Sequence, residues 1–379
     1  MNQIVKITDV CSFQGGTQPP KSVWKKNQVD GYIRMLQIRD FTQPEKNNVE
    51  YIPYKKTLKT CKSDDILIGR YGASVGKICT GLSGAYNVAL VKIIPDKNKI
   101  NRDYLLHLLK GNSFQNFILN VGSRAAQAGF NKDDLDGFTF SLPPLEQQKK
   151  IAAILDAADT YRQKTKALIK KYDELTQSLF LDMFGDPVSN PRKLPVKPLG
   201  ELCEFYSGRA WKKAELGGHG YKLVRISNLH KQHFPYWFYE GEMIEKHKVE
   251  NGDLLFSWAG VQASIDSYIY KGETAMINQH IYNIKPRHKI SKLFLYHLLQ
   301  LHLDNLRGSL GGGVGQFHLK KADITGIKII IPDDLTMNNY LSSLASLNKQ
   351  KEQALASLAQ AEDLFNSLLQ RAFKGELTS

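Results

Sequence analysis

The side chains in this sequence that are best suited to chemistry are those that bind nucleic acid. Arginine reads guanine, and asparagine and glutamine read adenine, through paired hydrogen bonds in the major groove of DNA. Lysine and arginine also contact phosphates, which fixes a protein's register on the duplex and supplies much of its affinity. Such residues flank short apolar runs in both halves of the 379-residue chain. This pattern favours a DNA-binding function.

The candidate DNA contacts fall into two groups, one in each half of the sequence. In the first half they are Arg34, Arg39, Lys55, Lys56, Lys59, Arg70, Tyr71, Ser74, Lys77, Arg124 and Gln127. In the second half they are Arg209, Trp211, Lys212, Lys213, Arg225, Asn228, Trp258, Gln262 and Gln316. The three lysines at 55, 56 and 59 are expected on phosphates. A solvated surface position is the alternative for each of these residues. His107 and His297 lie among leucines and are predicted to be core residues rather than ligands.

Motifs for catalysis and for metal binding are missing from the sequence. It has no [NDS]PP[YF] element for holding a target adenine, no (D/E)xK nuclease pair, and no HExxH, GxSxG or Walker A motif. The four cysteines form no CxxC and are expected to be buried thiols rather than a zinc site or disulfides. The GASVGK segment, residues 72–77, falls short of a phosphate loop and is predicted to be a strand-flanked turn whose glycines let the backbone approach a surface, with a plain turn as the alternative. We therefore predict a protein that is not an enzyme and binds no cofactor or metal itself.

Positive charge is concentrated in two stretches of the chain. The net charge is +14, of which residues 1–141 carry +8 and residues 186–330 carry +7, whereas residues 142–185 carry +1 and residues 331–379 carry −2. Two basic domains joined by nearly neutral segments indicate a polyanion held at two places. Lysine-rich surfaces that only maintain solubility are the alternative. No apolar run of about 18 residues and no secretion leader is present, so we expect a cytoplasmic protein.

The two halves of the chain repeat each other at an offset of about 190 residues. Six segments match in the same order, with Cys11 over Cys203, Arg70 over Trp258 and His107 over His297. Each half is predicted to contain short strands, a short helix, a glycine-rich loop and a last strand before a long helix. We predict an α+β fold with two β-rich globular domains at 1–141 and 199–332, long helices at 142–185 and 333–379 (the latter with the tail), and a proline-rich linker at 186–198.

The two long segments without internal proline or glycine carry heptad patterns, which predict two helices that pack as an antiparallel pair. Two unrelated surface helices are the alternative. The residues expected in the seam between the helices are Ile151, Ile154, Tyr161, Leu168, Tyr172, Leu175, Leu179, Leu341, Leu344, Leu355, Leu358, Phe365 and Leu369.

The sequence resembles the specificity (S) subunit of type I restriction–modification systems, in the form with two target recognition domains and two conserved helical regions. The resemblance covers almost the whole chain. The most specific segments are LPPLEQQKKIAAILD (residues 142–156), FGDP (184–187), LLQRAFKGEL (368–377) and GASVGK (72–77). The second half departs from the pattern, because residues 260–264 lack the Gly-Lys pair and the second long helix begins with IPDDLTMNNY instead of LPPLEQ.

The resemblance implies a non-catalytic DNA reader. Each recognition domain is expected to read one half of a bipartite asymmetric site in double-stranded DNA, while the helices act as a spacer and dock two methyltransferase (M) subunits. Two restriction (R) subunits join such complexes. S-adenosylmethionine is then the cofactor of the M subunit, and ATP with Mg²⁺ those of the R subunit. The competing hypotheses are a stand-alone DNA-binding or scaffold protein without methyltransferase partners, and a nuclease in its own right. The target bases and the gap between half-sites are not encoded in any recognisable motif.

Overall fold

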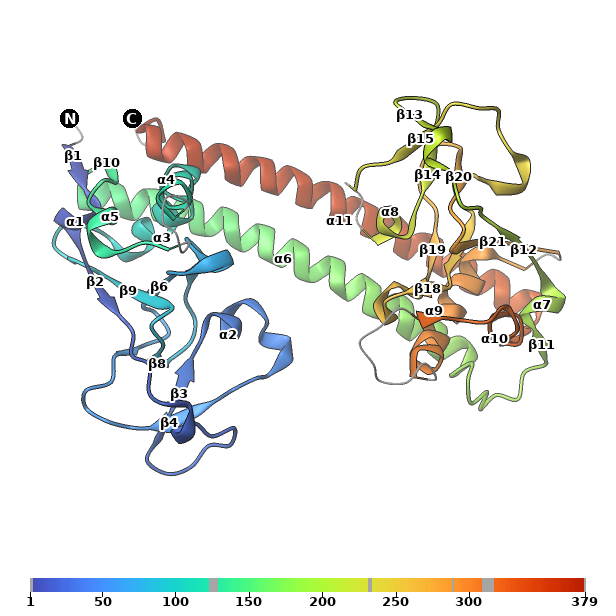
Figure 1. Ribbon diagram of the computed structural model, residues 1–379, viewed down its shortest axis with the longest axis horizontal. Coiled ribbons are helices and arrows are strands. Elements are labelled where there is room, and N and C mark those ends of the chain that lie inside the picture. Colours follow the sequence, from blue (N-terminus) through green and yellow to red (C-terminus); the bar gives the residue numbers. More distant parts are fainter. Residues whose placement is uncertain (1–2, 123–128, 231–233, 288–289, 309–316, 378–379) are drawn as a thin grey trace. The chain divides into compact units, whose positions relative to one another are not determined.

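The protein folds into two units that share two long helices. The computed structural model describes residues 3–122, 129–230, 234–287, 290–308 and 317–377 (Figure 1). Unit 1 comprises Met1–Ala167 together with Ala354–Ser379, and unit 2 comprises Leu168–Gln353. Both units mix helices and sheets, which confirms the predicted α+β class.

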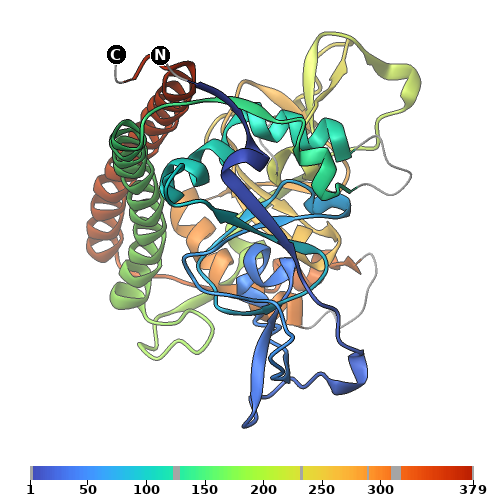
Figure 2. The ribbon, with the colours of Figure 1, turned by 90° about the vertical axis from the view of Figure 1, so that its left-hand side faces the viewer.

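Unit 1 is built from two four-stranded sheets and one two-stranded sheet. The first sheet has the order β2 (Cys11–Gly15), β9 (Leu90–Pro95), β6 (Ile66–Gly69), β7 (Ile78–Cys79). The second has the order β4 (Tyr51–Pro53), β3 (Tyr32–Leu36), β8 (Gly84–Tyr86), β5 (Thr60–Cys61), and β1 (Gln3–Lys6) pairs with β10 (Thr139–Leu142). The helices are α1 (Ile7–Val10), α2 (Ile38–Thr42), α3 (Arg102–Lys110), α4 (Asn112–Gly122) and α5 (Lys132–Leu135). Figures 1 and 2 show β3 and β4 at the end of unit 1 that lies away from β10 and the start of the first long helix.

Unit 2 repeats this plan. Its sheets are β12 (Cys203–Ser207), β21 (Ile281–Pro286), β17 (Leu254–Ser257), β19 (Asp266–Ile269), and β13 (Leu216–Gly217), β15 (Trp237–Tyr239), β14 (Tyr221–Val224), β20 (Ala275–Ile277), β16 (Lys248–Val249). Two further pairs are β11 (Val196–Pro198) with β23 (Lys328–Ile330) and β18 (Ala259–Gly260) with β22 (Phe317–His318). The helices are α7 (Leu199–Leu202), α8 (Ile226–His230), α9 (Lys292–Gly308) and α10 (Lys321–Thr325).

The strand pairing confirms the internal repeat and corrects its register in one segment. Cys11 faces Pro95 as Cys203 faces Pro286. In the other sheet, the parallel pair β3–β8 and the parallel pair β14–β20 show that Met35 corresponds to Leu223. Aligning the glycines that precede the two strands, Gly31 and Gly220, pairs Met35 with Val224 instead, which is one residue out of register.

The two long helices, α6 (Leu145–Phe184) and α11 (Asp334–Lys374), run antiparallel within each unit. In unit 1, Ile151 near the start of α6 belongs to the same buried cluster as Leu369 near the end of α11. In unit 2, Phe184 at the end of α6 packs on Tyr340 near the start of α11, with ring centroids 5.1 Å apart. The predicted antiparallel helices are therefore present.

The seam between the helices is only half as predicted. Ile151, Tyr172, Leu179, Leu341, Leu344, Leu358, Phe365 and Leu369 are buried or half-buried. Ile154, Tyr161, Leu168, Leu175 and Leu355 are exposed instead, which corrects their assignment. On α6 the covered stripe runs through Leu155, Arg162 and Ile169, one residue further along. The guanidinium carbon of Arg162 lies 4.3 Å from the ring centroid of Phe365. A pattern of large apolar residues missed this stripe because a long cationic side chain can cover apolar surface with its stem.

A histidine joins each globular part to a long helix; His107 is buried and His297 is half-buried. The Nε2 of His107 on α3 lies 2.7 Å from the Oδ1 of Asp156 on α6. The Nδ1 of His297 on α9 lies 2.6 Å from the Tyr340 hydroxyl on α11. The two histidines occupy equivalent places in the repeat, so each unit uses the same position to hold its helix.

The pairing of His297 predicts an acid-sensitive stability of unit 2. Burial, assisted by Lys351, lowers the pKa of His297 to about 4, whereas an unfolded histidine titrates near 6.5. Because the unfolded chain takes up the proton first, this contribution is complete above about pH 6.5 and is lost as the pH falls toward 4. From pH 7 to pH 5 we expect a loss of about 2 kcal/mol through this group. Urea unfolding at both pH values should show a smaller loss for His297→Gln, and equal losses would contradict the prediction.

Candidate nucleic-acid interface

A four-residue segment before β9 organises one end of unit 1. In this segment, residues 87–90, one N–H donates to the carbonyl of Leu36 at 3.1 Å. Two of its carbonyls accept from the N–H groups of Arg70, at 2.8 Å, and Gly16, at 3.1 Å. The end of β3, the turn after β6 and the end of β2 therefore meet at this segment.

Unit 2 repeats the same frame with different side chains. In residues 278–281, one N–H donates to the Val224 carbonyl at 3.0 Å, and two carbonyls accept from Trp258, at 3.2 Å, and Gly208, at 3.1 Å. The predicted correspondence of Arg70 and Trp258 is thus confirmed. A methyl group on Gly208 would lie 2.2 Å from the Asn278 oxygen, so only glycine permits this approach of the chain.

The turn that follows β6 is hydrogen-bonded to α4 on its inner side and presents side chains to solvent on its outer side. The amide nitrogen of Gln115 on α4 donates to the carbonyls of Gly76, at 3.0 Å, and Leu109, at 2.7 Å. Gly76 has a φ of 80°, a conformation that favours glycine. Tyr71 and Lys77 are exposed on this turn, while Ser74 is half-buried. The predicted turn at residues 72–77 is therefore anchored on its inner side.

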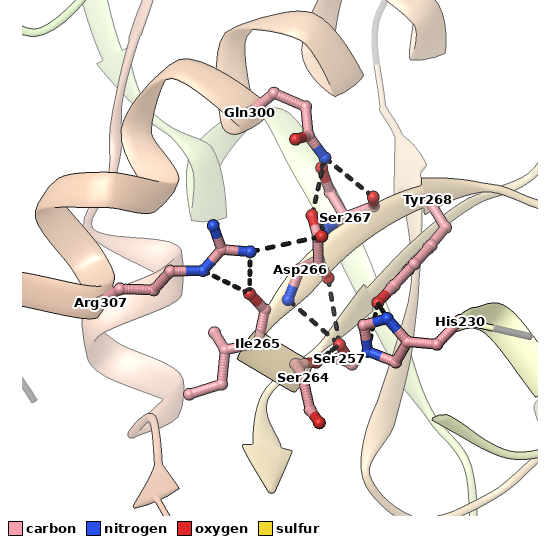
Figure 3. A network of polar contacts seen from close by, with 9 residues as sticks. All are labelled: His230, Ser257, Ser264, Ile265, Asp266, Ser267, Tyr268, Gln300 and Arg307. Atoms are coloured by element: carbon pink, nitrogen blue, oxygen red, sulfur yellow. Dashed lines mark hydrogen bonds and ion pairs between the residues drawn. The ribbon is translucent and has the colours of Figure 1, made fainter. Parts of the chain in front are cut away.

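The corresponding turn of unit 2 is fixed by a larger polar network, which Figure 3 shows. The Gln300 amide on α9 donates to Asp266 Oδ1 at 2.7 Å and to the hydroxyl of Ser267 at 2.9 Å. The Arg307 guanidinium donates twice to the Ile265 carbonyl, at 3.1 and 2.9 Å. The turn is thus rigid although it lacks the Gly-Lys pair.

At one surface position, the large side chain comes from the segment after β6 in unit 1 but from the paired segment on the other side in unit 2. In unit 1, Tyr71 bridges to Gly129, whose missing side chain leaves room for the tyrosine ring. In unit 2, Ala259 takes the place of the tyrosine and His318 that of the glycine. Beside them, the Arg70 Nε donates to the Phe130 carbonyl at 2.9 Å. The two units therefore share the backbone arrangement here but differ in the side chains that lie on it.

Ion pairs hold the arginines near α2. Arg34 Nη2 donates to Asp40 Oδ1 at 2.9 Å, and Arg39 Nη2 donates to Glu50. Burial raises the pKa of Glu50, but hydrogen bonds from Gln37 and Lys21 and the charge of Arg39 outweigh it, so the net shift is downward. The carboxylate is therefore kept charged beside its arginine.

The cations of unit 2 are stacked on aromatic rings. The Arg209 guanidinium carbon lies 4.0 Å from the Trp211 ring centroid, and Arg209 Nη2 donates to Glu215 Oε1 at 2.6 Å. Arg225 lies 4.0 Å from the ring centroid of Trp237, which is exposed. Burial lowers the pKa of Arg225. These stacks orient the guanidinium groups, as expected for nucleic-acid recognition.

Two predicted contacts are structural residues. Trp211 is buried in a cluster with Leu223 and Met276. Asn228 is buried too: its side-chain oxygen accepts from the Arg225 N–H at 3.1 Å, as Asp40 Oδ2 accepts from the Gln37 N–H in unit 1. These two side chains cap the starts of α8 and α2, which corrects the prediction for Asn228 as a DNA contact.

The remaining predicted contacts have a range of exposure. Exposed are Lys55, Lys56, Lys59, Tyr71, Lys77, Lys212, Lys213 and Gln262, and half-buried are Arg34, Arg39, Arg70, Ser74, Arg209, Arg225 and Trp258. Arg124, Gln127 and Gln316 lie outside the described residues.

Sequence reasoning missed five amide side chains near α2. Asn27, Gln28, Gln43, Asn47 and Asn48 line two hollows that also contain Arg39. The sequence does contain a signal for some of them, because three amides lie between Gln43 and Asn48, close to the candidate DNA contact Arg39.

Metal and membrane features are not found in the described part of the chain. Within it, no group of three or more His, Cys, Asp or Glu side chains is placed to hold a metal ion. Nor is any helix there both long and apolar enough to cross a membrane.

Comparison with known proteins places both units in one sequence family. The family described as type I restriction modification DNA specificity domain matches residues 2–176 and 191–357. The MjaVIII type I restriction enzyme specificity subunit of Methanocaldococcus jannaschii is 25% identical over 390 residues, covering 93% of this chain and 88% of that protein. The EcoKI specificity subunit of Escherichia coli K12 is 22% identical, with 94% and 86% covered.

Solved structures share the fold. The crystal structure of a type I restriction–modification S subunit from M. genitalium aligns with a TM-score of 0.58 at 14% identity, covering 98% of this chain and 96% of that one. A chain from a structural study of complex assembly and conformational transition in the type I R-M system aligns with a TM-score of 0.56 at 17% identity, covering 99% and 98%.

Proposed function

Because this chain belongs to the type I restriction modification DNA specificity family, we propose that it is the DNA-reading subunit of a type I restriction–modification complex. Unit 1 reads one half of a bipartite asymmetric site and unit 2 reads the other. The chain itself carries out no chemistry. Its DNA-facing surface is the end of each unit at which residues 87–90 and 278–281 gather the surrounding elements.

The observation that supports this proposal best is the contrast between the backbone and the side chains of the two units. Their hydrogen-bonded frames agree bond for bond around Arg70 and Trp258. The presented residues differ, with Tyr71 in unit 1 where unit 2 has Ala259. Two readers of different sequences need one scaffold and two sets of exposed side chains.

The long helices are proposed to set the spacing between the half-sites and to dock methyltransferase subunits. Ile154, Tyr161, Leu168 and Leu175 follow one another at intervals of seven along α6, and all four are exposed. An apolar row on the flank of a heptad seam is a surface for another helix. We assign this row, named the α6 flank, to a helix of the methyltransferase.

The proposed complex contains two M subunits and two R subunits and acts in the cytoplasm. S-adenosylmethionine belongs to the M subunits, and ATP with Mg²⁺ to the R subunits. This division leaves the present chain with DNA and protein partners alone. The net charge of +14 suits that role.

The test is methylation sequencing of a host genome that expresses this chain with its neighbouring methyltransferase, compared with a deletion of this chain alone. We expect a split motif with N6-methyladenine only when the chain is present. The motif would give both half-sites and the gap between them. Methylation that persists after the deletion would remove this chain from the reading role.

The lysines between β4 and β5 are expected to act on phosphates. Lys55, Lys56 and Lys59 are exposed. The slope of log K against log salt is negative, and replacing all three lysines with alanine should reduce its magnitude by about 2.7, at about 0.9 per phosphate contact. The measurement is a salt titration of target-duplex binding by the complex. Lys97 lies just beyond β9, at the opposite end of the strand from residues 87–90, so Lys97→Ala is the control and should leave the slope unchanged.

A further inference from the structure

Two adjoining hollows lie beside α2 in unit 1. Their volumes are about 210 and about 690 Å³, and Arg39, Asn47 and Asn48 line both of them. Gln43 also lines the smaller one, and Asn27 and Gln28 also line the larger one. The walls thus combine guanidinium groups with several amides, which are the groups that recognise purine edges in the major groove. Each hollow also contains one carboxylate, Asp40 in the smaller and Glu50 in the larger, and each of these carboxylates is paired with an arginine.

The guanidinium of Arg39 is held in place from behind. Glu50 accepts from Arg39 and also from the Gln37 amide, at 2.7 Å, and the Lys21 ammonium, at 3.3 Å. A side chain that is fixed before the ligand arrives loses little conformational freedom on binding. Because one edge of Arg39 faces Glu50, the carboxylate determines where the guanidinium points.

The two asparagines come from an unusual turn. Asn47 has a φ of 42°, in the left-handed region, and its N–H donates to the Pro44 carbonyl at 3.1 Å. Asparagine tolerates this conformation better than most residues, and such positions gather at functional sites. Both Asn47 and Asn48 are exposed at the rim of the hollows.

The segment that forms most of the walls of the hollows is positively charged. Residues 21–62 contain ten Lys and Arg against four Asp and Glu, a net charge of +6. The whole of residues 1–141 carries +8. Most of the charge that would attract a polyanion to unit 1 is therefore in the segment that forms these walls.

Unit 2 has different chemistry beside the equivalent helix. Ser227 on α8 stands where Arg39 stands on α2, since Asn228 and Asp40 are the matching caps. The hollow beside α8 is lined by Ile226, His230 and Phe234. The frame is shared and the lining is not, which is the pattern expected of positions that determine which bases are read.

We propose that the two hollows beside α2 are the base-reading subsite of unit 1, which takes the major-groove edges of purines. In this subsite Arg39 donates to guanine O6 and N7, and Asn47 or Asn48 pairs with adenine N6 and N7. Glu50 is a positioning residue for Arg39. The inference rests on the proposed function for the identity of the ligand as target DNA.

The test is selection of a randomised duplex library by the purified full-length chain with its methyltransferase, followed by sequencing of bound DNA. We expect Arg39→Ala to reduce the preference for one base pair by about 5- to 150-fold, within one half-site only. Arg39→Lys should retain binding but weaken the same preference, because an ammonium lacks the planar fork that fits guanine O6 and N7. Glu50→Gln should weaken that preference in part. Lys46→Ala, on the same turn but outside the hollows, is the control and should keep every base preference.

The outcomes separate this inference from the proposed function. If the wild type selects a split motif and the Arg39 and Glu50 variants select it with unchanged preferences, the subsite is overturned and the proposed function stands. Loss of both half-sites at once in a variant that still assembles with the methyltransferase would also overturn it, because the subsite is proposed to act on one half-site only. If the wild type selects a motif without directing methylation, the proposed function fails while the variants still test the subsite. If the wild type selects no motif, both fail.

Discussion

Replacing Gln148 with leucine is expected to lower the free energy of unfolding of unit 1 by about 4 kcal/mol. Gln148 is fully buried at the start of α6. Its side-chain oxygen accepts from the Asn101 N–H at 2.7 Å, and its amide donates to the carbonyls of Lys99, at 3.0 Å, and Pro143, at 2.8 Å. Leucine leaves three backbone groups without these partners, one of them buried and two part-buried, each at a cost of about 1 to 3 kcal/mol, which its greater hydrophobicity only partly offsets.

Urea unfolding followed by circular dichroism measures the effect. Gln177→Leu makes the same chemical change at an exposed position of the same helix and should stay within about 0.5 kcal/mol of the wild type. A Gln148→Leu variant as stable as this control would show that the bonds at the start of α6 do not hold the helix to unit 1.

The role of Gln148 also explains why the two long helices begin with different sequences. In unit 2, Asp333 caps the start of α11 instead, with Oδ1 accepting from the Thr336 N–H at 2.9 Å. The LPPLEQQ segment supplies an inward-facing glutamine, and the IPDDLT segment supplies a cap. The departure of the second helix from the family pattern is therefore a second solution to fixing a helix start.

The fold was largely predictable because the repeat doubles the information in the sequence. Matches such as Cys11 with Cys203 and Arg70 with Trp258 mark the same backbone positions twice, and the strand pairings bear them out. Chain composition alone also located α6, since no proline or glycine interrupts it. What the pattern could not supply was the side of the helix that is covered, because Arg162 replaces an apolar residue in the stripe.

The candidate site was less predictable for a related reason. An asparagine such as Asn228 suits a helix cap as well as a base edge, and only the tertiary structure shows that its amide is already used. Trp211, another candidate DNA contact, is buried in the core of unit 2. Conversely, Asn47 and Asn48 gain their significance from a left-handed turn and from the position of Arg39, neither of which has a local sequence signature.

The exposed flank of α6 leads to the second large expected effect, on assembly with the methyltransferase. Ile154 and Tyr161 are 39% and 54% exposed, far more than a seam residue such as Ile151 at 1%. Large apolar side chains with this exposure at seven-residue spacing leave apolar surface in contact with water, and a partner that covers them gains the free energy of burial. Charged residues at this flank would be the usual choice for a pair of helices that has no further partner.

The double variant Ile154→Asp with Tyr161→Asp should weaken binding of the methyltransferase by at least about 10-fold, since full burial of each side chain contributes about 1.5 to 3 kcal/mol and about half of each is still exposed in the free chain. Calorimetric titration of the purified partner into the full chain measures the change. The double variant Ala153→Asp with Thr160→Asp adds the same charges one residue earlier, on another exposed face, and should bind normally. Both variants should unfold at similar temperatures, because all four substituted positions are exposed in the free chain. Equal loss of binding in the two would point to net charge rather than to the α6 flank, and retention in both would place the methyltransferase elsewhere on the chain.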